Sequence, residues 1–284
     1  MMTVDRINLY NYFGIEKPLT AAGDLEIYIP TRNDRIGINR KRPAALVLPG
    51  GGYANTSERE AESVALKYVA EGYCAFVLRY SCKPNKYPLA LQEAGMAMVY
   101  IRENYEKYGV KADSVFSIGF SAGGHLCGCL ATLYDSEVLN FLGEKKVLVK
   151  PNACVLMYPV INARTHPASF INLCGDDKAL LDYLSLDERV TENSVPAYIF
   201  ATVNDNCVAV KNSLLMACAY EKAGVPFNLH ILEKGYHGLS VNDLTCDTAE
   251  ALAQRAETTP KNYNDWIGQV FTWLKERGFT ITTD

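Results

Sequence analysis

The 284-residue sequence lacks the features that mark several protein classes. It has no block of five or six like charges, its formal net charge is −4, and no apolar run approaches the ~18 residues of a membrane span. Such a chain offers no electrostatic footprint for nucleic acid or an anionic membrane. With 49% apolar and 21% charged residues, it is not a disordered or collagen-like chain either. We therefore expect a globular protein that binds neither nucleic acid nor membrane.

The sequence also lacks the cysteine patterns of metal or disulfide proteins. It has nine cysteines, an odd number, and no CxxC pair with the spacing of a zinc ribbon. The first 18 residues lack the apolar core of a signal peptide. We therefore predict a cytoplasmic protein without metal or cofactor, whose cysteines are mostly small core residues.

Short apolar, β-rich runs alternate with longer helical patterns along most of the chain. This alternation predicts an α/β fold, with a mostly parallel central sheet and helices on both of its faces. The predicted strands lie near residues 25–30, 44–48, 74–79, 114–119, 153–158, 197–203 and 227–232, and the predicted helices near 57–71, 89–108, 122–134, 211–223 and 263–277.

Residues 1–284 are predicted to form one domain, because no internal repeat or Pro/Gly/Ser-rich linker divides them. Two stretches interrupt the alternation. Residues of about 160–196 contain no clean strand and are predicted to form a small cap over a site. Residues of about 238–262 form a second excursion, between the last strand and the last helix.

The pattern G-x-S-x-G occurs once, centred on Ser121. The pattern alone is weak evidence, since it recurs by accident in about one chain in ten of this size. Here it lies between a predicted strand and a predicted helix, where a sharp turn raises the serine oxygen above the sheet. Gly119 and Gly123 are the small residues that let neighbouring backbones pass closely. Ser121 is therefore the predicted nucleophile.

A serine nucleophile needs a base to take its proton, and only four histidines are available. His125 lies in the helix that follows Ser121, His166 in the irregular stretch, and His230 within a strand. His237 follows the strand near 227–232, whose carboxyl end lies at the same edge of the sheet as the serine turn. His237 is the predicted base.

The base needs an acid to fix its tautomer, and we expect that acid at the end of the preceding strand. Asp205 stands there, after the strand near 197–203. Asp176 and Asp177 are alternatives, but they lie in the cap-like stretch rather than after a strand. Cys207, two residues from Asp205, raises the hypothesis that thiol oxidation affects activity.

Acyl transfer also needs donors for the oxyanion, each worth on the order of 3 kcal/mol in the transition state. The run Gly50-Gly51-Gly52 follows a predicted strand, and neither dinucleotide-binding nor P-loop spacing can be written on it. We predict an oxyanion hole formed by the backbone N–H groups of Gly51, Gly52 and Ala122. Tyrosines at strand ends or near these residues are candidates for stacking on a sugar. They are Tyr53, Tyr80, Tyr87, Tyr158 and Tyr236.

Four segments, residues 46–53, 108–126, 195–214 and 223–240, occur in the order typical of one family. In these segments the sequence resembles the α/β-hydrolase esterases known as acetylxylan or carbohydrate esterases, relatives of hormone-sensitive-lipase-like and prolyl-oligopeptidase-like hydrolases. The resemblance implies an α/β-hydrolase fold and a triad of Ser121, Asp205 and His237. It also implies that PGGGY replaces the HGGG oxyanion loop of the lipase-like branch. One departure is Ala209, where the resemblance leads us to expect proline.

Together these features predict a serine hydrolase that cleaves short acyl esters, acetyl esters first, by way of an acyl-enzyme. The resemblance suggests acylated oligosaccharides derived from xylan or other carbohydrates as its small-molecule substrates. Two alternatives remain open. An amidase, formamidase or peptidase would use the same triad, whereas a non-catalytic binding protein should lack one of its members.

Overall fold

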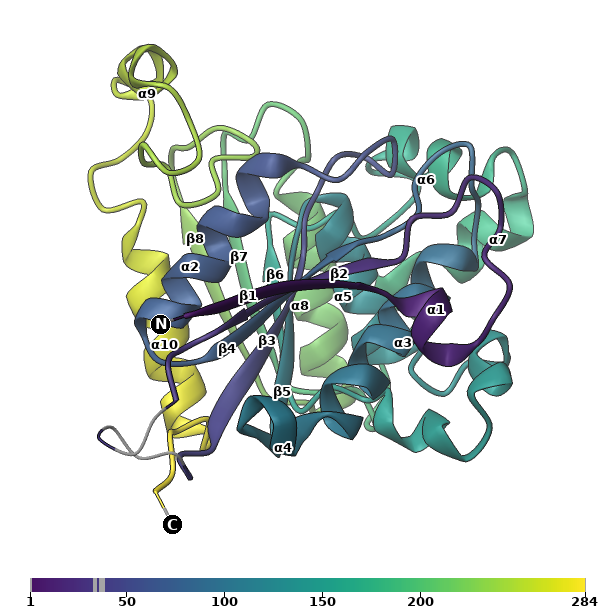
Figure 1. The fold of residues 1–284 in the computed structure, drawn as a ribbon. Helices are drawn as coiled ribbons and strands as arrows, with labels where there is room; N and C mark the ends of the chain where they lie inside the picture. Colours follow the sequence, from purple (N-terminus) through teal and green to yellow (C-terminus); the bar gives the residue numbers. More distant parts are fainter. Residues whose placement is uncertain (1, 33–34, 36–38, 284) are drawn as a thin grey trace.

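The computed structural model describes residues 2–32, 35 and 39–283. At its centre lies an eight-stranded sheet with the strand order β1-β2-β4-β3-β5-β6-β7-β8 (Figure 1). The pairs β1–β2 and β2–β4 are antiparallel, and every later pair is parallel. The strands are β1 (Thr3–Asn8), β2 (Asp24–Ile29), β3 (Arg42–Leu48), β4 (Cys74–Arg79), β5 (Val110–Phe120), β6 (Cys154–Met157), β7 (Ala197–Thr202) and β8 (Phe227–Leu232).

Helices cover both faces of the sheet. On one face α3, α5 and α8 pack into one apolar core, and on the other α2 and α10 pack into a second (Figure 1). The α-helices are α1 (Leu9–Phe13), α2 (Glu62–Ala70), α3 (Leu89–Glu103), α4 (Tyr105–Tyr108), α5 (Ala122–Thr132), α6 (Pro167–Cys174), α7 (Lys178–Tyr183), α8 (Lys211–Ala223), α9 (Ala249–Arg255) and α10 (Asp265–Glu276). The 3-10 helices are η1 (Glu58–Glu60), η2 (Glu137–Leu148) and η3 (Leu186–Glu188).

Strand β3 shows why the sheet needs cover on both faces. All of its residues are buried. Leu46 and Leu48 face the core beneath α3 and α5, whereas Ala45 and Val47 face the core beneath α2 and α10. Apart from Arg42 at its first position, β3 is apolar, which is the pattern of a strand buried on both faces and the one that predicted a parallel sheet.

The predicted strands and helices are all present, with small differences in their ends. The helix predicted near 57–71 is divided into η1 and α2, and the one near 89–108 into α3 and α4. Strand β1 was not predicted. Its sequence, TVDRIN, is mostly exposed at the edge of the sheet, so it lacks the alternation of apolar residues that signals a strand.

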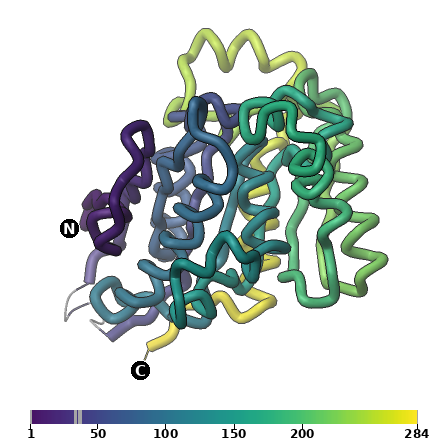
Figure 2. The backbone as a smooth tube through the Cα atoms, turned by 90° about the vertical axis from the view of Figure 1, so that its right-hand side faces the viewer, coloured from purple at the N-terminus to yellow at the C-terminus, as the bar shows by residue number. Residues whose placement is uncertain are grey.

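The two excursions, near residues 160–196 and 238–262, contain helices but no strand of the sheet. The first contains α6, α7 and η3, and the second contains α9. Figure 2 shows the α9 segment standing out from the rest of the chain. Across the described residues, every helix is too short or too polar to cross a lipid bilayer.

Candidate active site

Ser121 stands at a sharp turn between β5 and α5. Its backbone has φ +54° and ψ −117°, a conformation that residues other than glycine rarely adopt. A Cβ atom on Gly119 would lie 2.0 Å from the carbonyl oxygen of Gly123, and one on Gly123 would lie 2.1 Å from that of Leu48. The glycines of the G-x-S-x-G pattern are therefore needed because backbones pass too closely for any side chain.

The structure brings together the three residues predicted as a triad. His237 Nε2 lies 2.7 Å from Ser121 Oγ, and His237 Nδ1 lies 2.8 Å from Asp205 Oδ2. They follow β5, β7 and β8, three parallel strands whose carboxyl ends share one edge of the sheet. Asp205 and His237 have side chains only 1% and 15% exposed, and Ser121 is 8% exposed. The three side chains thus form one hydrogen-bonded chain that is largely shielded from water.

Asp205 is held by its own turn. Its Oδ1 accepts hydrogen bonds from the backbone N–H groups of Cys207 and Val208, each 2.8 Å long, which leaves Oδ2 to accept from His237 Nδ1. With Nδ1 donating, Nε2 of a neutral imidazole is free to accept the Ser121 proton. The alternative acid Asp177 instead caps the N-terminus of α7, where its carboxylate accepts from Leu180 N–H.

The residues that fix the histidine loop, defined here as residues 233–240, lie at the end of β7 or just after it and belong to no motif that predicts their role. Thr202 Oγ1 donates to the carbonyl oxygen of Gly235, and Asn204 Oδ1 accepts from the N–H of the same residue, both at 2.8 Å. Asn206 Oδ1 accepts from His237 N–H at 3.3 Å. The signal was visible as a cluster of polar residues around Asp205 at the exit of β7, but only the structure shows which loop they hold.

The oxyanion loop, defined here as residues 49–53, lies next to the Ser121 turn. Within the part of the chain that the structure describes, the backbone N–H groups of Gly51, Gly52 and Ala122 donate to no protein acceptor. Gly51 has φ +121° and Gly52 has φ +64°, so both occupy a region that favours glycine. The loop therefore leaves donors available where the sequence predicted an oxyanion hole.

Three hydrogen bonds anchor this loop from different sides. Tyr80 Oη donates to the carbonyl oxygen of Pro49 at 2.6 Å, and Gly50 N–H donates to Glu60 at 2.7 Å. From α6, the Asn172 side-chain amide donates to the carbonyl oxygen of Gly52 at 2.9 Å. The predicted cap segment thus contacts the oxyanion loop directly.

His125 is fully buried, and both of its ring nitrogens lie within hydrogen-bond distance of other groups of the protein. Its Nδ1 lies 2.8 Å from Tyr53 Oη, and its Nε2 lies 2.9 Å from the carbonyl oxygen of Leu184. Burial lowers the pKa of His125 to about 4, so its ring is neutral near pH 7. It supports the oxyanion loop by holding Tyr53.

The expectation that several tyrosines contact a sugar needs correction at three positions. Tyr53, Tyr80 and Tyr158 are each only 2% exposed. Their hydroxyl groups bind His125, the carbonyl oxygen of Pro49 and Glu60, respectively. Because their rings are packed in the protein, no free face remains for a sugar. Tyr87 and Tyr236 are partly exposed and stay candidates for substrate contact.

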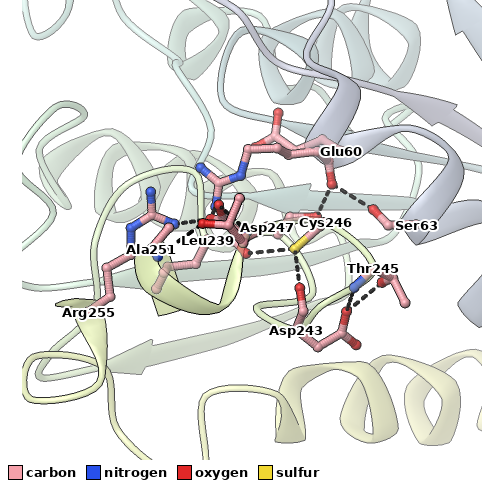
Figure 3. Close-up of polar contacts among 12 residues, drawn as sticks. Glu60, Ser63, Leu239, Asp243, Thr245, Cys246, Asp247, Ala251 and Arg255 are labelled. Atoms are coloured by element: carbon pink, nitrogen blue, oxygen red, sulfur yellow. Dashed lines mark hydrogen bonds and ion pairs between the residues drawn. The ribbon is translucent and has the colours of Figure 1, made fainter. Parts of the chain in front are cut away.

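The end of the histidine loop and the segment that follows it are bonded to the residues around η1. Ser240 Oγ donates to the carbonyl oxygen of Arg59 at 2.7 Å, and the Arg59 guanidinium pairs with Asp247 at 2.7 Å. Figure 3 shows Asp247 and Arg255 reaching each other in the second excursion, near Glu60. These contacts fix the path of the chain immediately after His237.

Comparison with known proteins gives the same assignment of fold and family. A family model described as BD-FAE matches residues 25–220. Over 71% of this chain, the sequence is 36% identical to endo-1,4-beta-xylanase B of Butyrivibrio fibrisolvens. Over 69% of this chain, it is 26% identical to an acetylxylan esterase of Xylanibacter ruminicola. The matched parts cover 33% and 40% of those relatives, so the chain spans well under half of their length.

Solved structures resemble the chain over nearly its whole length, and one of them is also more than 30% identical to it. It is an acetyl ester-xyloside bifunctional hydrolase from Caldicellulosiruptor lactoaceticus, 31% identical, with a TM-score of 0.79 and 97% of each chain covered. The matched family model covers more than half of the present chain, and the sheet carries the parallel strands and the strand-turn-helix at Ser121 that the resemblance implies. The chain therefore belongs to the BD-FAE family and has the α/β-hydrolase fold.

Proposed function

We propose that this protein is a carboxylic ester hydrolase that cleaves short acyl esters with Ser121 as nucleophile, His237 as general base and Asp205 as the orienting acid. The observation that carries the proposal is the hydrogen-bonded chain from Ser121 Oγ through the His237 ring to Asp205, with distances of 2.7 and 2.8 Å. The N–H groups of Gly51 and Gly52 in the oxyanion loop, and that of Ala122 next to Ser121, donate to no acceptor among the described residues and support the same chemistry.

In the proposed first step, His237 Nε2 takes the Ser121 hydroxyl proton while Oγ attacks the ester carbonyl carbon. The backbone donors bind the negative oxygen of the tetrahedral intermediate, and Asp205 stabilises the imidazolium. The intermediate then expels the alcohol, which receives its proton from His237, and leaves an acyl group on Ser121. Water, deprotonated by His237, then attacks the acyl carbon. The second tetrahedral intermediate expels Ser121 Oγ, which takes the proton back from His237, and the carboxylic acid is released.

The substrate class we propose is an acetylated oligosaccharide, with xylan-derived fragments as the first choice. The names of an acetylxylan esterase and an acetyl ester-xyloside hydrolase among the relatives support it. An amidase or formamidase acting through the same residues is the second candidate, because the three side chains serve ester and amide chemistry alike. We also propose a cytoplasmic location, since all nine cysteines are free thiols.

A fluorophosphonate probe and an ester panel test this proposal. The probe should label the wild-type protein and should not label Ser121→Ala, which should also lose hydrolysis of p-nitrophenyl acetate. The panel contains acetylated xylo- and manno-oligosaccharides, methyl ferulate, N-formylkynurenine and p-nitrophenyl esters of rising chain length. Faster turnover of N-formylkynurenine than of every ester would favour the second candidate. Labelling that persists in Ser121→Ala would overturn the assignment of the nucleophile.

A further inference from the structure

Glu60, at the end of η1, places a buried carboxylate behind the active site. The residue is 3% exposed. Its Oε2 accepts the N–H of Gly50 at 2.7 Å, and its Oε1 accepts the hydroxyl of Tyr158 at 2.8 Å. A Cβ atom built on Gly50 would lie 2.6 Å from Glu60 Oε2 and 3.0 Å from Ser121 Cβ. Gly50 of the oxyanion loop therefore lies directly between the Glu60 carboxylate and Ser121.

Through Tyr158, Glu60 is also connected to the loop that carries His237. The Tyr158 hydroxyl, which donates to Glu60, accepts the backbone N–H of Ser240 at 3.1 Å. The Tyr158 ring also packs edge-on against the His237 ring, with 5.1 Å between centroids. Ser240 in turn donates through its hydroxyl to the carbonyl oxygen of Arg59, the residue before Glu60. The histidine loop is thus joined twice to the segment that carries Glu60.

Within the described part of the chain, Glu60 is held by hydrogen bonds and not by an ion pair with a neighbouring basic side chain. The charged or titratable groups that face it are Arg59, Tyr80, Tyr158, His237 and Tyr263. Arg59 has its ion pair with Asp247 instead. Burial raises the pKa of Glu60, whereas the hydrogen bonds from Tyr158 and Gly50 and the charge of His237 lower it. Burial is the largest of these effects, so the pKa of Glu60 is raised overall, while the hydrogen bonds that both carboxylate oxygens accept favour the anion against it.

We propose that Glu60 is a positioning residue. It holds the oxyanion loop and the histidine loop in fixed positions on either side of Ser121, and its negative charge favours the imidazolium of His237. This inference rests on the proposed function, because imidazolium forms only if His237 takes the serine proton. A second buried carboxylate provides a contrast. Glu93 accepts hydrogen bonds from Ser81 and Tyr10, and neither belongs to the oxyanion loop or the histidine loop. Glu93 therefore supplies a matched control.

The test compares Glu60→Gln with Glu93→Gln and the wild type in the full chain, with p-nitrophenyl acetate as substrate. Glutamine keeps the shape of the side chain and removes its charge. For Glu60→Gln we expect kcat to fall about 10- to 100-fold, less than for a lost oxyanion donor, with KM changed less than about threefold. The acidic limb of the pH profile of kcat/KM should move to lower pH, because a nearby negative charge no longer helps the imidazole retain its proton. Glu93→Gln should keep kcat within about twofold of the wild type and should not move the limb.

A second variant separates the hydrogen-bond link from the charge. Tyr158→Phe keeps the ring against His237 but removes the hydroxyl that joins Glu60 to Ser240. We expect kcat to fall about 3- to 10-fold, with a smaller movement of the acidic limb than in Glu60→Gln. If Glu60→Gln does not fold, Tyr158→Phe decides, and an unchanged kcat overturns the inference.

The outcomes separate the two proposals. Wild-type turnover and Ser121 labelling, combined with an unaltered kcat and pH profile in Glu60→Gln, overturn the role of Glu60 alone. An equal loss in Glu93→Gln also overturns it, because the effect would then belong to any buried carboxylate. A wild type that hydrolyses no ester and takes no fluorophosphonate overturns the proposed function and the role of Glu60 together.

Discussion

The side chain of Asn172 in α6 donates its amide proton to the carbonyl oxygen of Gly52, at 2.9 Å, and so joins the first excursion to the oxyanion loop. This bond fixes the orientation of the peptide unit between Gly52 and Tyr53. Without that partner the peptide unit could turn, and Gly52, which carries one of the proposed oxyanion donors, would be held less firmly. The first excursion therefore helps to hold the oxyanion loop in place.

Asn172→Ala should lower kcat for p-nitrophenyl acetate by about tenfold, which corresponds to one hydrogen bond of about 1.4 kcal/mol. The unfolding midpoint in urea should change little, because Asn172 is only partly buried. Asn193→Ala is the control, since Asn193 is exposed and lies outside the site. Equal kcat values for both variants would show that the oxyanion loop does not depend on α6.

Asp205→Asn tests the choice of acid. Asparagine keeps the acceptor for Cys207 and Val208 N–H, but its amide nitrogen would face His237 Nδ1 and favour the wrong tautomer. We expect kcat to fall about 10³- to 10⁴-fold. Asp177→Asn should retain full activity, because asparagine is as good a helix N-cap as aspartate. A large loss in Asp177→Asn with little change in Asp205→Asn would reverse the assignment.

The backbone packing at the Ser121 turn can be tested through stability. Gly123→Ala places a Cβ atom 2.1 Å from the carbonyl oxygen of Leu48, so we expect a loss of about 3 kcal/mol or more in the free energy of unfolding, or no folded protein. Gly268 in α10 offers the opposite case, since a Cβ atom there meets nothing within 4 Å. Gly268→Ala should be neutral or stabilise by up to about 1 kcal/mol. Urea denaturation of both variants provides the comparison.

His125 gives the fold a calculable dependence on pH. Its pKa is lowered by burial from 6.5 to about 4, so between these values the unfolded chain binds a proton that the folded chain does not. The stability due to neutral His125 is therefore complete above pH 6.5 and is lost as the pH falls toward 4, by about 3 kcal/mol at most.

The measurement for His125 is the difference in unfolding free energy between pH 7 and pH 4.5, taken for the wild type and for His125→Gln. The difference should be smaller in the variant, because glutamine does not titrate. Comparing the two proteins matters, since the raised pKa values of buried Glu60 and Glu93 act in the opposite direction. Equal differences in the two proteins would contradict the prediction.

The surroundings of Cys207 predict how readily its thiol is oxidised. Burial and the negative charge of Asp205 both raise the pKa of the Cys207 thiol, which reduces the reactive thiolate at pH 7. We therefore expect mild peroxide at pH 7 to leave ester hydrolysis by the wild type unchanged. Rapid inactivation that is absent in Cys207→Ser would show that the thiol reacts despite this environment.

Local patterns in the sequence are enough to predict the strands and the position of the candidate site. Continuous apolar runs such as that of β3 identify buried parallel strands, and the positions of Ser121, Asp205 and His237 relative to strand ends place them at one edge of the sheet. Chain order and strand polarity suffice for this, because the carboxyl ends of parallel strands lie together. The exposed edge strand β1 carries no such pattern and could not be predicted this way.

Which side chains support the site, and which merely lie near it in sequence, depends on contacts between distant segments of the chain. Tyr53 and Tyr158 stand at strand ends like substrate-binding residues, yet packing from other segments buries their rings and assigns their hydroxyl groups to His125 and Glu60. Glu60 itself belongs to a short charged segment typical of a solvated turn. Glu60 is buried because Gly50, Tyr158 and the histidine loop pack around it, and the hydrogen bond from Ser240 to Arg59 joins segments 181 residues apart in the chain. Local pattern cannot encode such contacts, because the free energy of burying a carboxylate depends on donors that distant parts of the chain supply.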